Sequence, residues 1–71
     1  MSDEIYKTIG ERIRSTRKAQ GLTQEGLAER ANIDRSHMGF IEQGRRQPTI
    51  STLAKICQVL HLSLEQLFRD L

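Results

Sequence analysis

A short segment of the chain, residues 35–43, carries side chains that are able to read base edges in the DNA major groove. As a helix of about 100° per residue, it separates a buried face, with Met38 and Ile41, from an outward face. The outward face carries Ser36, Gly39, Phe40 and Gln43, with Arg35 beside it in the first turn. Arginine can pair bidentately with guanine, serine can donate or accept, and a phenyl ring can contact a thymine methyl group. The missing side chain of Gly39 would let the helix sit deeper in the groove.

Each of these residues also has a plainer interpretation. Arg35 would contact phosphate only, and Ser36 would be a solvated residue early in a helix. Gly39 would have no specific role, and Phe40 would fold back onto the edge of the core. The residues alone leave both interpretations open.

The surrounding residues have the spacing of a helix-turn-helix. A first helix is predicted over about 24–31, with Leu27 and the small Ala28 on its inner face. Asn32 stands at the corner, where the backbone needs a residue that tolerates a positive φ. Asp34 is a good N-cap for the second helix. Two helices joined by so short a turn place the second one in the major groove, so DNA binding is the leading hypothesis.

Residues that flank these two helices are suited to phosphate. Gln24 begins the first helix of the motif, where free backbone N–H groups and the positive end of the dipole favour an anion. Thr23 precedes it and can assist, although capping is its main expected role. Arg45 and Arg46 follow the second helix and should straddle the DNA backbone, the alternative being a solvated loop. Such contacts supply affinity rather than specificity.

Apolar periodicity elsewhere predicts three further helices and no strand, so the 71-residue chain is predicted to form one compact all-α domain of five helices, residues 1–71. The first of the three spans about 3–20, with an inward stripe of Tyr6, Ile9, Ile13 and Arg17. The second begins after a cap at Thr49 or Ser51 and has a stripe of Ile50, Leu53, Ile56, Cys57 and Leu60. The third follows a capping box of Ser63 and Gln66 and carries Leu64, Leu67, Phe68 and Leu71.

Catalysis and metal binding have little support in the sequence. His37 and His61 make no metal-ligand spacing with Cys57. Ser36 and His37 are adjacent on a helix, so their side chains diverge and cannot pair as nucleophile and base. None of the five glycines fits a phosphate-binding loop. We expect no enzyme activity, no cofactor, no metal and no small-molecule ligand.

Composition agrees with a globular protein, at 37 % hydrophobic and 28 % charged residues with a net charge of +2. The N-terminal residues lack the pattern of a signal peptide, and no apolar run approaches the length of a membrane span. A single cysteine suits a reducing compartment. We therefore expect a cytoplasmic protein without membrane contact.

Three segments, 21–28, 41–44 and 62–68, resemble the phage-repressor/Cro family of helix-turn-helix regulators, also called the xenobiotic-response-element (XRE) family. The resemblance implies a lambda-repressor-like fold with the helix-turn-helix, about 23–43, in helices 2 and 3. It implies base contacts at Arg35, Ser36, Gly39 and Phe40, a phosphate contact at Gln24 and an ion pair between Arg17 and Glu42. The short length and residues 34–36 are similar to small single-domain regulators, including the controller proteins of restriction-modification systems.

One helix-turn-helix reads few base pairs, and two copies about a two-fold axis read a palindrome. We expect a homodimer on a palindromic operator, joined through apolar residues of the last helix: Leu64, Leu67, Phe68 and Leu71. The alternative for these residues is that all of them pack within one chain. The alternative for the whole protein is an interaction module, such as an antitoxin or co-regulator that depends on a partner protein.

Overall fold

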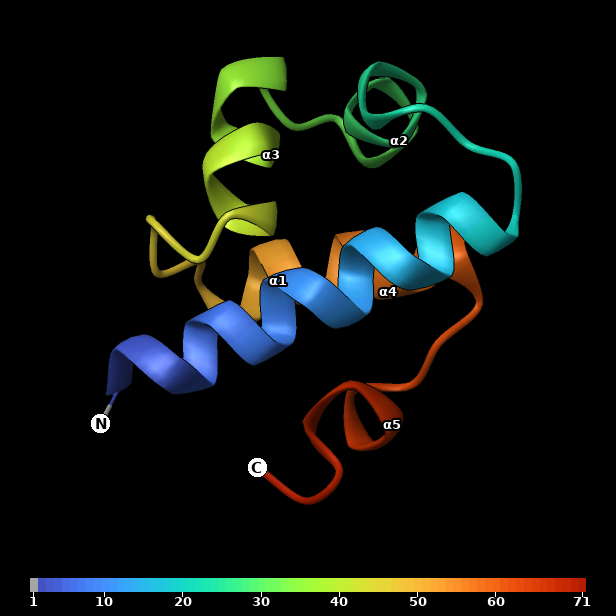
Figure 1. Cartoon of the computed structure of the whole chain (residues 1–71). Coiled ribbons are helices and arrows are strands. Elements are labelled where there is room, and N and C mark those ends of the chain that lie inside the picture. The colour runs from blue at the N-terminus through green and yellow to red at the C-terminus, as the bar shows by residue number, and fades with distance from the viewer. Residues whose placement is uncertain (1) are drawn as a thin grey trace.

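Five helices account for most of the chain. The computed structural model describes the backbone of residues 2–71 and the side chains of residues 4–71. The helices are α1 (Ser2–Ala19), α2 (Gln24–Ala31), α3 (Arg35–Glu42), α4 (Ile50–Leu60) and α5 (Leu64–Phe68). No strand occurs among these residues, so the predicted all-α, five-helix fold is confirmed. In Figure 1, α1 runs across the middle, with α2 and α3 on one side of it and α5 on the other.

Side-chain caps define where the helices begin. Thr23 Oγ1 accepts from Gly26 N at 2.9 Å at the start of α2. Thr49, rather than Ser51, caps α4, because its hydroxyl accepts from Thr52 N at 3.1 Å. The capping box before α5 is complete, with Ser63 N donating to Gln66 Oε1 at 2.9 Å and Gln66 N donating to Ser63 Oγ at 3.0 Å. Each cap satisfies a backbone N–H that a helix start would otherwise leave without a partner.

The turn between α2 and α3 has the predicted construction. Asn32 adopts φ 58° and ψ 47°, the left-handed conformation, and its N–H donates back to the end of α2. Ile33 N also donates to Ala28 O, at 2.8 Å. The Asp34 carboxylate then accepts from the backbone N–H groups of Ser36 and His37, at 3.1 and 3.3 Å. The entry of the chain into α3 is therefore held by hydrogen bonds from both sides.

The core is formed by one stripe from each helix. The side chains that are almost fully enclosed are Ile13, Leu27, Met38, Ile41, Leu53, Ile56, Leu60 and Leu67. The stripe expected on α1 is present, since Ile9, Ile13 and Arg17 are buried and Tyr6 is half-buried against the core.

Two expectations about apolar residues were wrong. Ile50 is 59 % exposed, because it occupies the first turn of α4 where no neighbouring helix covers it. Leu71 lies beyond α5, which ends at Phe68 because Arg69 has an extended backbone with ψ 131°. Leu71 is therefore not part of a helical stripe and is 48 % exposed.

Two glycines allow α1 to approach the end of α3. A Cβ on Gly10 would lie 2.5 Å from Ile41 O and 2.6 Å from Glu42 O, so only glycine fits at this crossing. Gly44 has φ +74°, and a Cβ there would lie 2.7 Å from Lys7 Cα. These contacts place the C-terminal end of α3 directly against α1.

Candidate nucleic-acid interface

A buried ion pair joins α1 to α3. Arg17 Nε donates to Glu42 Oε2 at 2.8 Å, and Arg17 Nη2 donates to Glu42 Oε1 at 3.0 Å. Arg17 Nη1 also donates to Leu22 O at 2.9 Å, so the same guanidinium holds the segment that leads into α2. The two side chains are 9 % and 2 % exposed. Arg17 and Glu42 therefore pair as expected, with the bidentate geometry that is strongest for these groups.

The Gln24 side chain joins this pair from the surface. Gln24 Nε2 donates to Glu42 Oε1 at 3.2 Å, the oxygen that also accepts from Arg17. On its other side the amide lies over Gly39, where a Cβ would come within 3.3 Å of Gln24 Oε1. The start of α2 and the middle of α3 are thus connected through one half-buried side chain.

The side chains expected to read bases are gathered on one surface of α3. A shallow hollow of about 310 Å³ is lined by Gln24, Arg35, Ser36, Gly39, Phe40 and Gln43. Arg35, Ser36 and Gln43 are exposed, whereas Gly39 and Phe40 are half-buried. These six residues, called here the recognition hollow, form a continuous concave surface that an incoming ligand can reach.

The Phe40 ring has a partner within the chain. The Arg46 guanidinium lies over this ring, with 5.4 Å between Cζ and the ring centroid. Arg45 N donates to Phe40 O at 2.9 Å, which fixes the start of the loop that follows α3. The side chains of both arginines are exposed. A cation–π contact therefore covers part of Phe40 and holds Arg46 beside the recognition hollow.

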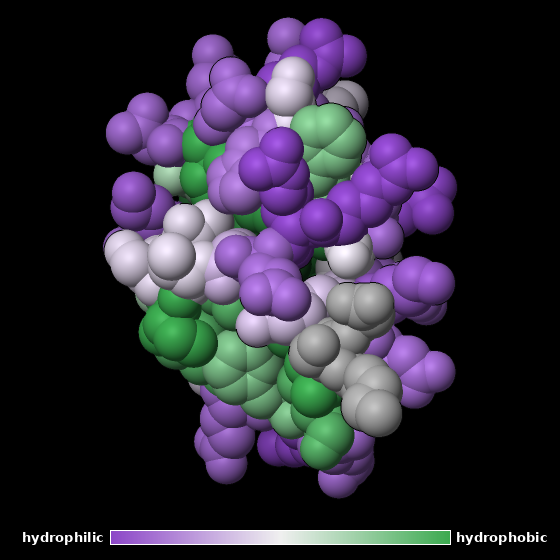
Figure 2. Space-filling model, turned by 90° about the vertical axis from the view of Figure 1, so that its left-hand side faces the viewer, coloured by the Kyte–Doolittle hydropathy of each residue, from purple (hydrophilic) through white to green (hydrophobic). Residues whose placement is uncertain are grey.

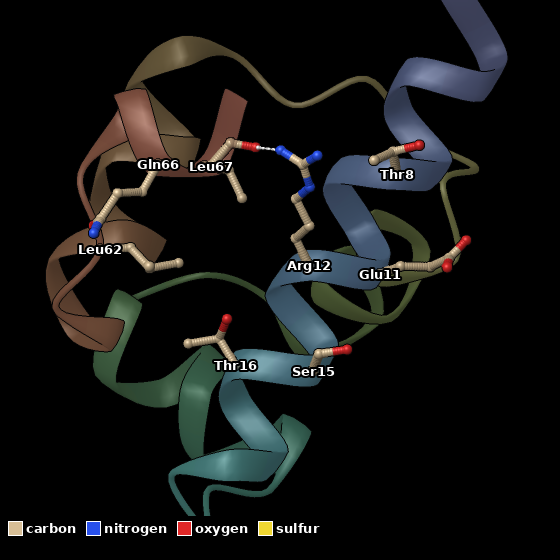
Figure 3. A pocket seen from close by; sticks show the side chains of 8 residues that line it. All are labelled: Thr8, Glu11, Arg12, Ser15, Thr16, Leu62, Gln66 and Leu67. Carbon is tan, nitrogen blue, oxygen red and sulfur yellow. Dashed lines mark hydrogen bonds between the residues drawn. The ribbon is translucent and has the colours of Figure 1, made fainter. Parts of the chain in front are cut away.

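A second hollow lies between α1 and α5 (Figure 3). Arg12 reaches across it, and its Nη1 donates to Leu67 O at 2.8 Å. Leu62 and Thr16 also line it, while Glu11 and Ser15 point away from α5 in this view. Because Arg12 already binds a carbonyl group of α5, the arrangement serves to hold α5 against α1.

Other chemistry is sparse in the part of the chain that the structure describes. No group of three or more His, Cys, Asp or Glu side chains is placed there to hold a metal ion. Cys57 is a free, buried thiol, and burial raises its pKa. Among the described helices, none is both long enough and apolar enough to cross a membrane.

An apolar groove lies apart from the recognition hollow and shares no residue with it. Its lining consists of Ile5, Tyr6, Ile9, Pro48, Ile50, Leu53, Phe68 and Leu71. Ile5, Ile50 and Leu71 are the exposed members, at 43 %, 59 % and 48 %. Figure 2 shows hydrophobic residues gathered on the lower half of one face, below a mostly hydrophilic upper half. This groove joins the beginning of α1, the beginning of α4 and the end of the chain.

The residues expected at a dimer interface lie in different environments. Leu67 is only 1 % exposed within a single chain, so it belongs to the core and offers no surface to a second copy. Leu64 and Phe68 are half-buried against the core, and Leu71 is exposed. Sequence reasoning did not include Ile5 or Ile50 in this surface, because periodicity assigns a residue to a helix face without showing where the neighbouring helix ends.

The fold and the recognition hollow define a helix-turn-helix protein. A helix-turn-helix family model (HTH_3) matches residues 13–67. The chain belongs to this family of XRE-type transcriptional regulators.

Individual relatives agree with this assignment. The chain is 41 % identical over 67 residues to YazB of Bacillus subtilis, named as an HTH-type transcriptional regulator, with 94 % of this chain and 93 % of YazB covered. It is 42 % identical over 57 residues, 80 % of its length, to the immunity repressor protein of Bacillus phage phi105, but spans only 40 % of that repressor. Among solved structures, the restriction-modification controller protein C.AhdI from Aeromonas hydrophila matches with a TM-score of 0.85 and 35 % identity, over 89 % of this chain and 96 % of that one.

Proposed function

We propose that this chain is a sequence-specific regulator of transcription that binds double-stranded DNA with α3 in the major groove. The observation that carries the proposal is the recognition hollow, in which Arg35, Ser36, Gly39, Phe40 and Gln43 share one accessible surface of α3. In this arrangement Arg35 and Ser36 stand in the first turn of α3, the part of a recognition helix that reaches base edges.

Phosphate contacts would come from both ends of the motif. Arg45 and Arg46 are exposed just after α3, and Arg46 is held in place by Phe40. At the start of α2, the Gln24 backbone N–H is available to an anion. The Thr23 hydroxyl accepts from Gly26 N and so holds the helix start that faces the phosphate, while its own O–H could still donate to a phosphate oxygen.

The active unit would be a homodimer on a palindromic operator in the cytoplasm. One copy has a single recognition helix and therefore reads one half-site, and half-sites one helical turn apart are separated by about 34 Å. The apolar groove would supply the surface for pairing. It includes Phe68 and Leu71, which the sequence predicts at the interface, and also Ile5 and Ile50.

Two substitutions test the DNA contacts. Arg35→Ala should relax the preference at one base position by about 1–3 kcal/mol, because it removes a base contact. Arg45→Ala should weaken all duplexes alike and reduce the slope of log affinity against log salt by about one. Arg45 is the better phosphate variant, since removing Arg46 would also uncover Phe40. If neither change alters binding, α3 is not the DNA-binding element.

A further inference from the structure

We infer that the Gln24 side chain reads a base edge in the major groove, in the space left by the absent side chain of Gly39. This inference rests on the proposed function and adds a specificity-determining residue that belongs to α2 rather than α3. The group that Gln24 would recognise is an exocyclic amino group, adenine N6 or cytosine N4, because those are the donors exposed in the major groove.

The orientation of the Gln24 amide is determined by its neighbours. Nε2 lies 3.2 Å from Glu42 Oε1, and an amide turned by 180° would place its oxygen against that carboxylate oxygen. Two acceptors would then face each other at the edge of the core, which is unfavourable. The amide nitrogen therefore faces Glu42 and the amide oxygen faces Gly39.

The hydrogen bonds around Glu42 hold this orientation. Glu42 is fixed by two hydrogen bonds from Arg17, at 2.8 and 3.0 Å, before it accepts from Gln24. A side chain fixed in this way loses less conformational entropy when it binds than a free glutamine does. Gln24 is also half-buried, so its amide does not sample the solvent freely.

Gly39 provides the room for this arrangement. The built Cβ position of Gly39 lies 3.3 Å from Gln24 Oε1, 3.8 Å from Cδ and 3.9 Å from Nε2. A side chain at position 39 would therefore press against the Gln24 amide, which would have to shift. The position on α3 that has no side chain is covered by an amide from α2, and that amide lines the recognition hollow with Arg35 and Phe40.

The chemistry of the amide oxygen separates a base contact from a phosphate contact. Phosphate oxygens only accept hydrogen bonds, so the Gln24 amide oxygen cannot bind them. The same oxygen matches an amino group on a base edge. The Gln24 backbone N–H and the second N–H of the amide can still meet phosphate, so the two contacts involve different atoms of one residue.

The test is a double-mutant cycle on the DNA site that the wild-type protein selects from random duplexes. Affinities are measured for that site and for its variants at each base pair, using Gln24→Met, Gly39→Ala and the double variant. Gln24→Met keeps the length of the side chain but removes its hydrogen-bonding atoms. Glu25→Met, at the exposed neighbouring position, is the matched control.

We expect Gln24→Met to reduce the preference at one base pair in each half-site by roughly tenfold and to leave the other positions unchanged. Gly39→Ala should reduce the preference at the same base pair, because it shifts the amide. In the Gln24→Met background it should have a much smaller effect. Glu25→Met should leave every preference as in the wild type.

Two results would overturn the inference while leaving the proposed function intact. One is a uniform loss of affinity for all duplexes in Gln24→Met with a lower salt dependence, which is the behaviour of a phosphate contact. The other is an unchanged preference at every base pair in both single variants. If the wild type selects no sequence at all, the proposed function fails and the inference fails with it. Should Gln24→Met not fold, as judged by circular dichroism, Gly39→Ala alone must still reduce the preference at a single base pair.

Discussion

At the scale of single residues, the Arg17 guanidinium joins three parts of the chain: α1, α3 and the segment before α2. It binds Glu42 on α3 with two hydrogen bonds and the carbonyl group of Leu22 before α2 with a third. Glu42 in turn orients Gln24 at the surface. The buried charge of Arg17 therefore helps to shape the recognition hollow, because its hydrogen bonds fix how α3 is placed relative to α1 and α2.

Removing one partner of this pair should destabilise the protein strongly. We expect Arg17→Ala to lower the free energy of unfolding by about 3–5 kcal/mol, because Glu42 would remain buried without its opposite charge. Urea denaturation at a fixed chain concentration measures this loss. Arg14→Ala, an exposed arginine on the same helix, is the control and should change stability by less than about 0.5 kcal/mol. Equal effects of the two substitutions would contradict the role given to the pair.

Cys57 gives a prediction for pH dependence. Burial raises the pKa of this thiol, so the unfolded chain loses the proton at a lower pH than the folded chain does. Stability should therefore be unaffected by the thiol at neutral pH and should fall as the pH rises above about 8.5, by up to about 1.4 kcal/mol per pH unit. Urea denaturation of the wild type and of Cys57→Ala between pH 7 and 10 isolates this effect. A constant difference between the two proteins over that range would count against it.

At the scale of helices, the crossing of α1 over the end of α3 determines how α3 is placed. Gly10 lets the backbones of α1 and α3 approach closely. The Arg17–Glu42 pair joins the same two helices further along α1. The turn at Asn32 and the Asp34 cap then fix where α3 begins. Local backbone chemistry and one close crossing thus determine which face of α3 meets the solvent.

Adding a methyl group at this crossing should be costly. Gly10→Ala would place Cβ within 2.6 Å of two carbonyl oxygens, and overpacking of this kind costs about 1–3 kcal/mol. The gain in helix propensity, about 1 kcal/mol at most, would offset only part of this. We expect a lower urea midpoint and weaker DNA binding. Glu11→Ala at the exposed neighbouring position should have little effect, and a stabilised Gly10→Ala protein would show that the crossing can relax.

Element boundaries were the most predictable part of the fold. Asn32, Asp34 and the Ser63–Gln66 box act through atoms within a few residues in the sequence, so their roles follow from local chemistry. The Arg17–Glu42 pair was expected from resemblance to a family. The exposure of Ile50 and the tight crossing at Gly10 depend on where distant helices lie, and a single helical pattern does not contain that information.

The residues of the candidate site could be predicted from the sequence, but the contacts among them could not. Periodicity placed Ser36, Gly39, Phe40 and Gln43 on one face, and these residues line one hollow. The contact between Gln24 and Glu42 and the stacking of Arg46 on Phe40 join residues of different segments. Those contacts depend on the packing of α2 and of the loop after α3, which only the folded chain provides.

The whole molecule presents two separate surfaces, the recognition hollow on α3 and the apolar groove at the beginnings of α1 and α4. An exposed apolar patch on a small chain indicates an interaction site. In the proposed dimer this groove is covered by a second copy. A groove that instead received another protein would indicate a partner-dependent regulator, such as an antitoxin or co-regulator.

Charging the groove should prevent pairing. We expect Ile50→Lys to shift the protein from dimer to monomer in sedimentation equilibrium and to weaken operator binding, because a lysine would be buried in the apolar contact. Ser51→Lys adds the same charge at the next, exposed position of α4 and should leave the dimer intact. A dimer that persists in Ile50→Lys would place the interface elsewhere.

Sequence-specific binding by a dimer is tested most directly by selecting binding sites from random duplex DNA at near-physiological salt. We expect enrichment of a palindrome whose half-sites lie about 10–10.5 base pairs apart, one helical turn of DNA. We also expect occupancy to follow the dimer concentration. Weak binding without any enriched sequence would show that the chain is not a sequence-specific DNA-binding dimer.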